Sequence, residues 1–320
     1  MFRLLLAALT IMLTALAFPA TAQQAQTAPP IRLTLILDWF VNPDHGPIIV
    51  AEERGYFAEA GLKVEIVAPA DPNDPPKLVA AGRADLAVTY QPQLIMQAAE
   101  GLPLVRVATL VDTPLNSLVV LRDGPIKSLA DLKGRKIGFS VGGVEEALLM
   151  TMLGRHGLKL GDVTLVNVNF SLSPALLAGQ VDAVIGAFRN FELNQLAIAG
   201  RPGRAFYVEE EGVPSYDELI VVANRARARA PEIRRFVDAI ERGVAYTINN
   251  PDAAWTLFIK GRANLDDEIN RRAWKDTLPR FAHSPAALDR LRYERFARFL
   301  HERGLIATPP PLDDYAIEPR

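Results

Sequence analysis

Three short segments of the sequence place aromatic rings beside amide, carboxylate or imidazole groups. The first, residues 38–46, contains four candidate ligand-binding residues: Asp38, Trp39, Asn42 and His45. An aromatic ring offers a flat surface for stacking, and the neighbouring polar groups can hydrogen-bond the edge of a planar heteroaromatic compound. The segment therefore predicts a binding site for such a compound. The alternative is that Trp39 belongs to the core and that residues 42–46 only cap the following helix.

The second and third segments, residues 89–93 and 186–192, repeat this mixture of groups. Their candidate ligand-binding residues are Tyr90, Gln91, Phe188, Asn190 and Glu192. A glutamate in a site closed to water can accept paired hydrogen bonds from a ring amine and an adjacent ring N–H. The alternative for both segments is an ordinary helix start, where a carboxylate is also favourable.

A fourth segment, residues 140–146, follows an apolar strand and opens a helical pattern. Free backbone N–H groups at a helix start can hold an anion or a carbonyl oxygen, so Ser140, Gly142 and Gly143 are further candidates. The segment contains no lysine, and Glu145 and Glu146 disfavour a phosphate.

The motifs of common enzyme classes are missing from the sequence. It contains no phosphate-binding loop of the G-x-x-x-x-G-K-[ST] type, no G-x-G-x-x-G, no G-x-S-x-G and no H-E-x-x-H. The absence of cysteine excludes disulfides, thiolate metal sites and cysteine nucleophiles. The four histidines are far apart in the sequence: His45, His156, His283 and His301. We therefore expect no catalytic residue, no metal site and no cofactor.

Composition and the N-terminus narrow the class of protein. The chain has 320 residues, enough for two hydrophobic cores, and its 35 Lys and Arg nearly balance its 37 Asp and Glu. This balance disfavours a nucleic-acid-binding surface. Residues 1–22 carry an early arginine, an apolar run and a small-residue Ala-Thr-Ala end, which is typical of a cleaved signal peptide. Residues 23–30 are polar and end in two prolines, which favours a flexible leader.

Apolar segments with strand and helix periodicity alternate along the rest of the chain. The sequence predicts strands at 31–37, 63–67, 85–88, 104–110, 116–121, 136–139, 163–167, 182–185, 205–208 and 219–223. It predicts helices at 46–59, 75–82, 91–101, 144–156, 174–179, 190–199, 231–248, 251–260 and 286–303. A pattern of helix, glycine cap, strand, helix, Gly-x-x-Asp and strand occurs twice, around Asp85 and around Asp182.

The repeat favours an α/β protein of two lobes, each with a mixed, mostly parallel sheet flanked by helices. We expect lobe one to span 31–115 and 213–308, with extra C-terminal helices, and lobe two to span 116–212, followed by a tail at 309–320. Ligands of open α/β sheets bind at the carboxyl ends of strands. The candidate segments follow predicted strands, so we expect them to face a cleft between the lobes.

Several motifs identify a family resemblance that covers roughly residues 31–306. They are Leu37-Asp38-Trp39-Phe40-x-Asn42-x-x-His45, Gly55-Tyr56-Phe57, Ala81-Gly82-x-Ala84-Asp85-Leu86, Asp131-Leu132-Lys133-Gly134 and Val184-Ile185-Gly186-Ala187-Phe188. With these motifs the chain resembles the type II periplasmic solute-binding proteins of ABC importers. Within them it looks like the group that binds thiamine-pyrimidine precursors, which is related to the thiamine-pyrimidine synthases.

The resemblance implies a periplasmic monomer that captures a small heteroaromatic ligand, formylaminopyrimidine or hydroxymethylpyrimidine, and passes it to an inner-membrane permease. It implies that Trp39, Asn42 and His45 lie beside the ligand, with Tyr90 as a second aromatic ring and Glu192 gripping the aminopyrimidine edge.

The chain also departs from these relatives. They often carry Tyr-Trp before a His-Glu pair, where this chain reads Phe188-Arg189-Asn190-Phe191-Glu192. Arg189 therefore keeps open an alternative ligand: riboflavin, a sulfonate or another organic anion. A synthase that uses His45 and Glu192 is a further alternative. Residues 89–93 do not carry the synthases' reactive lysine and histidine, however, and the chain has no cysteine for their iron motif.

Overall fold

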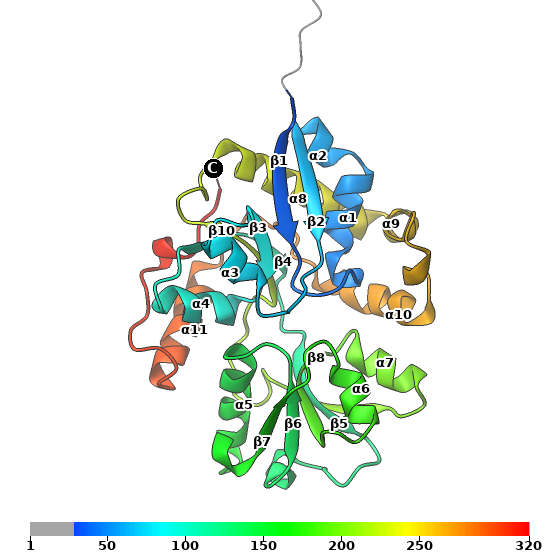
Figure 1. Ribbon diagram of the computed structural model, residues 1–320, viewed down its shortest axis with the longest axis vertical. Helices are drawn as coiled ribbons and strands as arrows, with labels where there is room; N and C mark the ends of the chain where they lie inside the picture. The colour runs from blue at the N-terminus through cyan, green and yellow to red at the C-terminus, as the bar shows by residue number, and fades with distance from the viewer. Residues whose placement is uncertain (1–28, 320) are drawn as a thin grey trace, which may run out of the picture.

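The computed structural model describes residues 29–319, so the expected signal peptide (1–22) and residues 23–28 of the expected leader lie outside the described residues. The described chain forms two lobes, one above the other in Figure 1, each built on its own sheet. The chain crosses between them twice, at residues 112–115 and 208–218.

The two five-stranded sheets have the same topology. Lobe one has the order β2-β1-β3-β10-β4 and lobe two the order β7-β6-β8-β5-β9. The strands of lobe one are β1 (Ile31–Ile36), β2 (Leu62–Val67), β3 (Leu86–Thr89), β4 (Leu104–Val111) and β10 (Leu219–Asn224). Those of lobe two are β5 (Asn116–Leu121), β6 (Lys136–Phe139), β7 (Thr164–Asn167), β8 (Ala183–Phe188) and β9 (Gly203–Tyr207). The fourth strand of each sheet is antiparallel to its neighbours and the first three are parallel, which confirms the predicted fold class.

The Gly-x-x-Asp repeat has the same structural role in both lobes. The Asp85 carboxylate accepts the backbone N–H of Thr34 at 2.9 Å, and the Asp182 carboxylate accepts that of Lys136 at 2.8 Å. Each aspartate thus ties the start of its strand to the neighbouring parallel strand. The glycine three residues earlier has a φ of 69° in one lobe and 68° in the other, a left-handed conformation that favours glycine.

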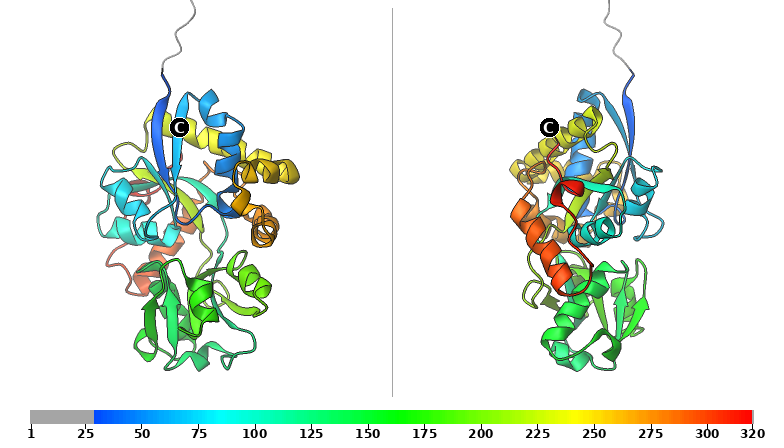
Figure 2. Two further views of the ribbon diagram at one scale, coloured as in Figure 1. Left: turned by 45° about the vertical axis from the view of Figure 1, so that its right-hand side comes forward. Right: turned by 90° about the vertical axis from the view of Figure 1, so that its left-hand side faces the viewer.

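Helices flank both sheets, and lobe one carries more of them (Figure 1). The helices of lobe one are α1 (Gly46–Glu53), α2 (Tyr56–Glu59), α3 (Pro75–Ala80), α4 (Gln91–Ala99), α8 (Pro231–Asn249), α9 (Pro251–Ile259), α10 (Glu268–Thr277) and α11 (Arg290–Glu302). Those of lobe two are α5 (Val144–Arg155), α6 (Leu172–Leu177) and α7 (Glu192–Ile198). The C-terminal helices pack on lobe one, and α10 also contacts α7 of lobe two (Figure 2).

Two helix predictions need correction. The single helix predicted over residues 46–59 is broken into α1 and α2, because Gly55 adopts a φ of 74° between them. Helix α10 was not predicted. Its buried face consists of Asn270, Ala273, Trp274 and Thr277, so this face has one large apolar residue in a helix that is otherwise mostly polar.

The C-terminal residues form part of the packing of lobe one. The side chain of Arg106 on β4 is fully buried, and its guanidinium donates to the carbonyl oxygens of Ile317 at 3.1 Å and Ala286 at 3.0 Å. Tyr315 is also buried, and its ring stacks beside that of Tyr293. Residues 315–317 of the expected tail therefore lie against the sheet of lobe one.

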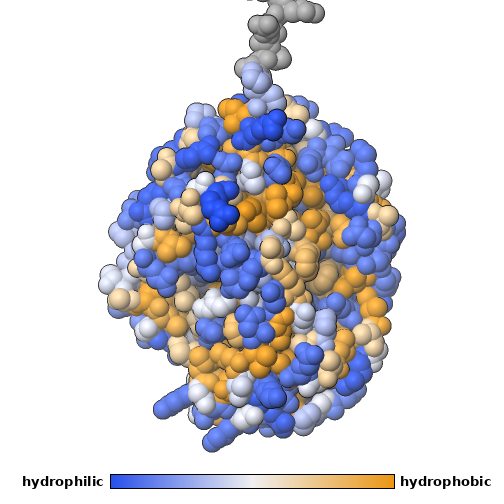
Figure 3. All heavy atoms as spheres, viewed as in Figure 1, coloured by the Kyte–Doolittle hydropathy of each residue, from blue (hydrophilic) through white to orange (hydrophobic). Residues whose placement is uncertain are grey.

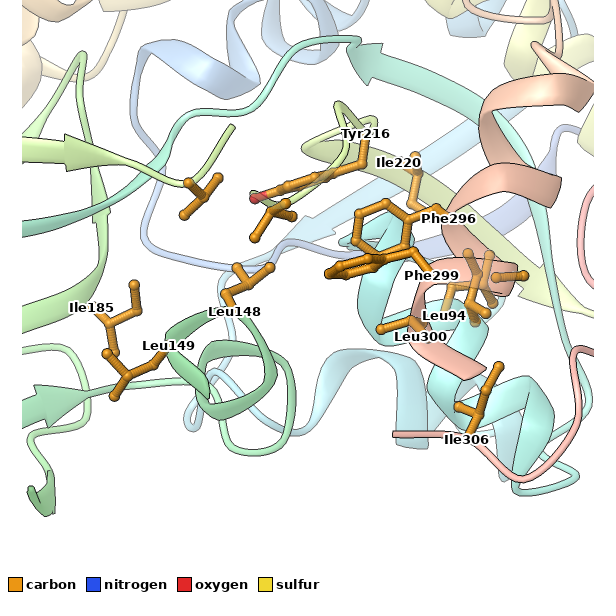
Figure 4. Packing of buried hydrophobic residues seen from close by; sticks show 14 of the residues in the cluster. Leu94, Leu148, Leu149, Ile185, Tyr216, Ile220, Phe296, Phe299, Leu300 and Ile306 are labelled. Atoms are coloured by element: carbon orange, nitrogen blue, oxygen red, sulfur yellow. The ribbon is translucent and has the colours of Figure 1, made fainter. Parts of the chain in front are cut away.

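One cluster of buried apolar residues includes side chains of both lobes (Figure 4). Tyr216, on the second crossing segment, packs edge-on against Phe296 of α11, with ring centroids 5.3 Å apart. The same cluster contains Leu148 of α5 and Ile185 of β8. The crossing segment is therefore anchored in apolar packing where the lobes meet.

The surface is mixed in character. On the face drawn in Figure 3, hydrophobic residues are interspersed with hydrophilic ones over both lobes. Within residues 29–319, no helix is both long enough and apolar enough to cross a membrane.

Candidate functional site

A cavity lies between the lobes, at the carboxyl ends of β1, β3 and β8. Lobe one and the crossing segments contribute Asp38, Trp39, Asn42, Asp44, Tyr90, Pro92, Tyr216 and Glu218. Lobe two contributes Asn116, Val144, Glu145, Leu172, Gly186, Phe188, Phe191 and Glu192. Aromatic rings and carboxyl groups dominate this lining, so the cavity suits a flat ligand whose edge carries hydrogen-bond donors.

The wall of lobe one is a closed hydrogen-bond network around Asp38. The backbone N–H of Asn42 donates to Nδ1 of His45 at 3.2 Å, so the ring proton lies on Nε2. Nε2 then donates to one carboxylate oxygen of Asp38 at 2.8 Å, and the Tyr90 hydroxyl donates to the other at 3.0 Å. Both oxygens of Asp38 are thus held by neighbours. The network fixes Asp38 and Tyr90 at the cavity surface.

A second carboxyl of lobe one, Asp44, connects the two lobes. It lies in the short helix η1 (Pro43–His45) and is buried. Its Oδ1 accepts the side-chain amide of Asn190 from lobe two at 2.6 Å and the hydroxyl of Thr277 at the end of α10 at 3.0 Å. Burial raises the pKa of Asp44 to about 6.

The wall of lobe two carries two buried glutamates. Glu192 opens α7 and accepts the backbone N–H of Phe188 at 2.7 Å. Glu145 accepts the backbone N–H of Ser140 at 2.8 Å, and its carboxyl lies against Gly186, where a Cβ atom would stand 2.2 Å from it. Burial raises the pKa of both glutamates to about 8, and the backbone hydrogen bonds offset this only in part. Both carboxyls therefore hold a proton at neutral pH.

Glu218 joins the two crossing segments at the cavity. Its Oε2 accepts the backbone N–H groups of Leu115 at 2.6 Å and Asn116 at 2.9 Å, and the hydroxyl of Tyr216 at 3.0 Å. Burial raises the pKa of Glu218 to about 7. A glutamate on the second crossing thus holds the first crossing in place.

No lysine or arginine lines the cavity as far as the described chain extends. Arg189 points elsewhere: its guanidinium donates to both carboxylate oxygens of Glu209, at 2.6 and 2.8 Å, and lies over the ring of Tyr207. The lining is therefore rich in acidic residues. Arg189, which follows the lining residue Phe188 in the sequence, is already paired with Glu209. Among residues 29–319, no group of three or more His, Asp or Glu could hold a metal ion.

The sequence-predicted residues divide into two groups. Those that line the cavity are Asp38, Trp39, Asn42, Tyr90, Phe188 and Glu192. His45, Gln91 and Asn190 lie behind the lining. His45 orients Asp38, Asn190 bonds to Asp44, and Gln91 accepts the backbone N–H of Asp217 at 2.8 Å.

The glycine-rich segment at 140–143 does not line the cavity. The backbone N–H of Gly142 donates to the side chain of Asn73 in lobe one at 2.9 Å, and that of Gly143 donates to Glu146 at 3.1 Å. Ser140 accepts the Asn73 amide at its carbonyl oxygen, at 3.2 Å. The N–H groups expected to meet a ligand are instead used within the protein, and the segment ties lobe two to lobe one.

Sequence reasoning missed several residues of the lining: Asp44, Pro92, Asn116, Val144, Glu145, Leu172, Gly186, Phe191, Tyr216 and Glu218. Some of them lay within the segments already chosen. Among these, Asp44 and Glu145 could have been selected because a carboxyl group can bind a ligand by hydrogen bonds. Tyr216 and Glu218 lie on the crossing between lobes. Glu218 directly precedes β10, where the chain returns to lobe one. A polar residue at this position, just before a strand predicted to follow a crossing, is the signal that could have identified it.

Comparison with other proteins identifies the family. Residues 42–254 match the family model described as NMT1/THI5 like. A Haemophilus influenzae protein assigned by name to thiamine biosynthesis is 54% identical over 288 residues, which cover 90% of this chain and 92% of that protein. The formylaminopyrimidine-binding protein of Halalkalibacterium halodurans is 37% identical over 238 residues, 74% of this chain and 71% of that protein.

Among solved structures, the alkanesulfonate-binding protein SsuA from Xanthomonas axonopodis pv. citri, bound to MOPS, superposes with a TM-score of 0.71. It is 16% identical, and the match covers 91% of this chain and 99% of that one. This likeness concerns the fold, which is the type II fold of periplasmic binding proteins. With two thirds of its length matched by the family model and a 54% identical relative, this chain belongs to the NMT1/THI5-like family.

Proposed function

We propose that this protein is the substrate-binding component of an ABC importer, and that it captures a thiamine-precursor pyrimidine, formylaminopyrimidine or hydroxymethylpyrimidine. The observation that carries the proposal is an interlobe cavity with aromatic walls and buried carboxyls, and burial raises the pKa of Glu192 among them to about 8. The 37% identical relative named for formylaminopyrimidine binding supports the same ligand class. The proposal includes a periplasmic monomer that delivers its ligand to a permease in the inner membrane.

Glu192 has the chemistry to recognise the edge of an aminopyrimidine. That edge places an amino group, a donor, beside a ring nitrogen, an acceptor. A protonated carboxyl matches it, because its O–H donates to the ring nitrogen and its other oxygen accepts from the amino group. A pKa of about 8 keeps Glu192 in this form at neutral pH. Trp39 and Tyr90 supply aromatic surface for the ring.

Closure of the lobes couples binding to transport. A ligand shifts a two-state equilibrium only through contacts that the closed form adds to those of the open form. A shift from mostly open to mostly closed requires about 5 kcal/mol of differential affinity. In this cavity Asp38 and Glu192 come from different lobes, so a ligand that touches both adds contacts only when the lobes close.

The alternatives are less consistent with the cavity. An organic anion such as a sulfonate would find no lysine or arginine in the lining described here, because Arg189 is paired with Glu209 outside it. A synthase that uses His45 as an acid or base would need that ring at the ligand, yet His45 is fully buried and bonded to Asp38. A pyrimidine phosphate would likewise find no cation in this lining to pair with its phosphate.

Isothermal titration with a panel of ligands tests the proposal. The panel contains formylaminopyrimidine, hydroxymethylpyrimidine, hydroxymethylpyrimidine phosphate, riboflavin and an alkanesulfonate. We expect binding of the unphosphorylated pyrimidines only, and mass spectrometry should recover them unchanged. If the sulfonate binds and the pyrimidines do not, the ligand is an organic anion and the proposed ligand class is wrong. If mass spectrometry finds a converted product, the protein is an enzyme.

A further inference from the structure

Three aromatic rings from the two lobes meet beside the cavity. Trp39 and Phe40 follow β1 in lobe one, and Phe170 lies between β7 and α6 in lobe two. The ring centroid of Phe170 is 4.6 Å from that of Trp39 and 4.5 Å from that of Phe40. We call Trp39, Phe40 and Phe170 the aromatic gate. Because its members come from different lobes, the gate exists only while the lobes are closed.

The aromatic gate extends from the cavity to the solvent. Trp39 lines the cavity and also packs against an apolar cluster of lobe two. Phe40 is 53% exposed to solvent. Phe170 is half-buried and contacts both rings, so it lies between the wall of the cavity and the outside. Phe170 does not line the cavity itself; it packs against Trp39, the ring that does.

The backbone that presents Phe170 is held in an unusual conformation. Asn169 has a φ of 49°, the one non-glycine residue with a positive φ in the described part of the chain. Its N–H donates to the side chain of Asn167 at 2.8 Å, and its carbonyl oxygen accepts the hydroxyl of Ser140. Such conformations persist where surrounding contacts hold them, and they concentrate at ligand clamps and switch regions.

The same loop is connected to lobe one through a second contact between the lobes. Ser140, which bonds to Asn169, also accepts the side-chain amide of Asn73 from lobe one. The backbone N–H of Gly142 donates back to Asn73 at 2.9 Å. Closure therefore fixes the Phe170 loop by hydrogen bonds and by ring contacts together.

From this arrangement we propose that Phe170 is the gating residue of the cavity: it packs against Trp39 when the lobes close, holds that ring beside the ligand and so sets how long the ligand stays bound. The inference rests on the proposed function for the identity of the ligand, although the ring contact itself does not depend on it. Loss of the Phe170 ring should speed dissociation much more than it changes association, because the contact forms after the lobes close.

Stopped-flow kinetics with formylaminopyrimidine tests the gate. We expect Phe170→Ala to raise the dissociation rate constant about tenfold, the scale of two lost aromatic contacts, and to change the association rate constant by less than about threefold. Phe170→Tyr keeps the ring and should stay within about twofold of the parent protein. Ile198→Ala, which removes an exposed apolar side chain from the same lobe, is the matched control and should have no effect. A dissociation rate of Phe170→Ala within about twofold of the parent would overturn the proposal.

A second measurement is made on the protein saturated with formylaminopyrimidine, in which the lobes are closed. Acrylamide quenching of Trp39 fluorescence is obtained by subtracting the signal of Trp39→Phe, which retains Trp255 and Trp274. Phe170→Ala should raise the quenching constant of Trp39 about twofold, because it removes one of the two rings that contact Trp39. Unchanged quenching would contradict the gate even if the pyrimidine binds. If calorimetry shows no pyrimidine binding to the parent protein, the proposed function fails; if the pyrimidine binds and the quenching is unchanged, the gate alone fails.

Discussion

The two lobes share one architecture and differ in the chemistry that they bring to the cavity. In lobe one, both oxygens of Asp38 are held by His45 and Tyr90, so this wall is fixed before any ligand arrives. In lobe two, Glu145 and Glu192 are held by backbone N–H groups, and burial raises their pKa to about 8. The same strand order therefore builds one rigid, hydrogen-bonded wall and one proton-bearing wall. Repetition of a fold positions side chains at the same sheet edge without repeating their chemistry.

The largest change in ligand affinity is expected when the carboxyl group of Glu192 is removed. Glu192→Ala should weaken formylaminopyrimidine binding about 100-fold at pH 7, because two hydrogen bonds in a site closed to water are lost. Glu192→Gln should stay within about tenfold, since an amide accepts from Phe188 and from the amino group while donating to the ring nitrogen, as a protonated carboxyl does. Titration calorimetry measures both.

Glu210→Ala, at an exposed position of lobe two, is the control and should bind like the parent protein. If Glu192→Gln binds as poorly as Glu192→Ala, the ligand is held by an ionised carboxylate, and the contrast between the two walls is wrong.

The pH dependence of stability separates the walls without any ligand. In the folded protein Glu145 and Glu192 keep their protons up to about pH 8, whereas in the unfolded chain they lose them near their ordinary pKa of 4.5. The free energy of unfolding should therefore fall as the pH rises, and between pH 6 and pH 8 by at least about 1 kcal/mol. Asp44 of lobe one, with a pKa of about 6, contributes mainly below this window, whereas Glu218 on the second crossing segment, with a pKa of about 7, also contributes within it.

Urea unfolding at pH 6 and pH 8 checks this slope. Glu192→Gln should reduce it, because an amide does not titrate. A free energy that is flat or rises across this window would mean that the glutamates of lobe two are ionised in the folded protein.

The smallest change in pyrimidine affinity is expected from substitution of Arg189. Its guanidinium is bound by Glu209 and lies outside the cavity lining, so Arg189→Gln should change pyrimidine affinity by less than about threefold. Titration of the parent protein and of this variant with an alkanesulfonate is the companion measurement. A sulfonate that binds the parent and loses more than tenfold in the variant would support the anion alternative instead.

The sequence predicted the sheets well because their signals are local. The Gly-x-x-Asp repeat identified two equivalent units, and in each of them the aspartate holds the neighbouring strand. Helix α10 was not predicted because its buried face includes polar residues such as Asn270 and Thr277. The burial of polar residues depends on tertiary contacts, which a local apolar pattern does not reveal. Thr277 illustrates this, since its hydroxyl bonds to Asp44, more than 200 residues away in the chain.

The site was predicted only in part, for a similar reason. Residue type and position after a strand selected Trp39, Tyr90 and Glu192, which line the cavity. The same signals selected Gln91 and Ser140, whose polar groups bond within the protein. Whether a polar side chain serves a ligand or a neighbour depends on long-range contacts that no local pattern contains. Glu218 was missed because its role arises from the meeting of two crossing segments.

A crystal structure of the protein grown with formylaminopyrimidine is the most direct test of the central claim that the two walls enclose an intact pyrimidine. The account predicts an unmodified ring in the cavity beside Trp39, with its amino group and ring nitrogen paired to Glu192. A ring bound outside the interlobe cavity, or a cavity that excludes the compound at saturating concentration, would contradict it.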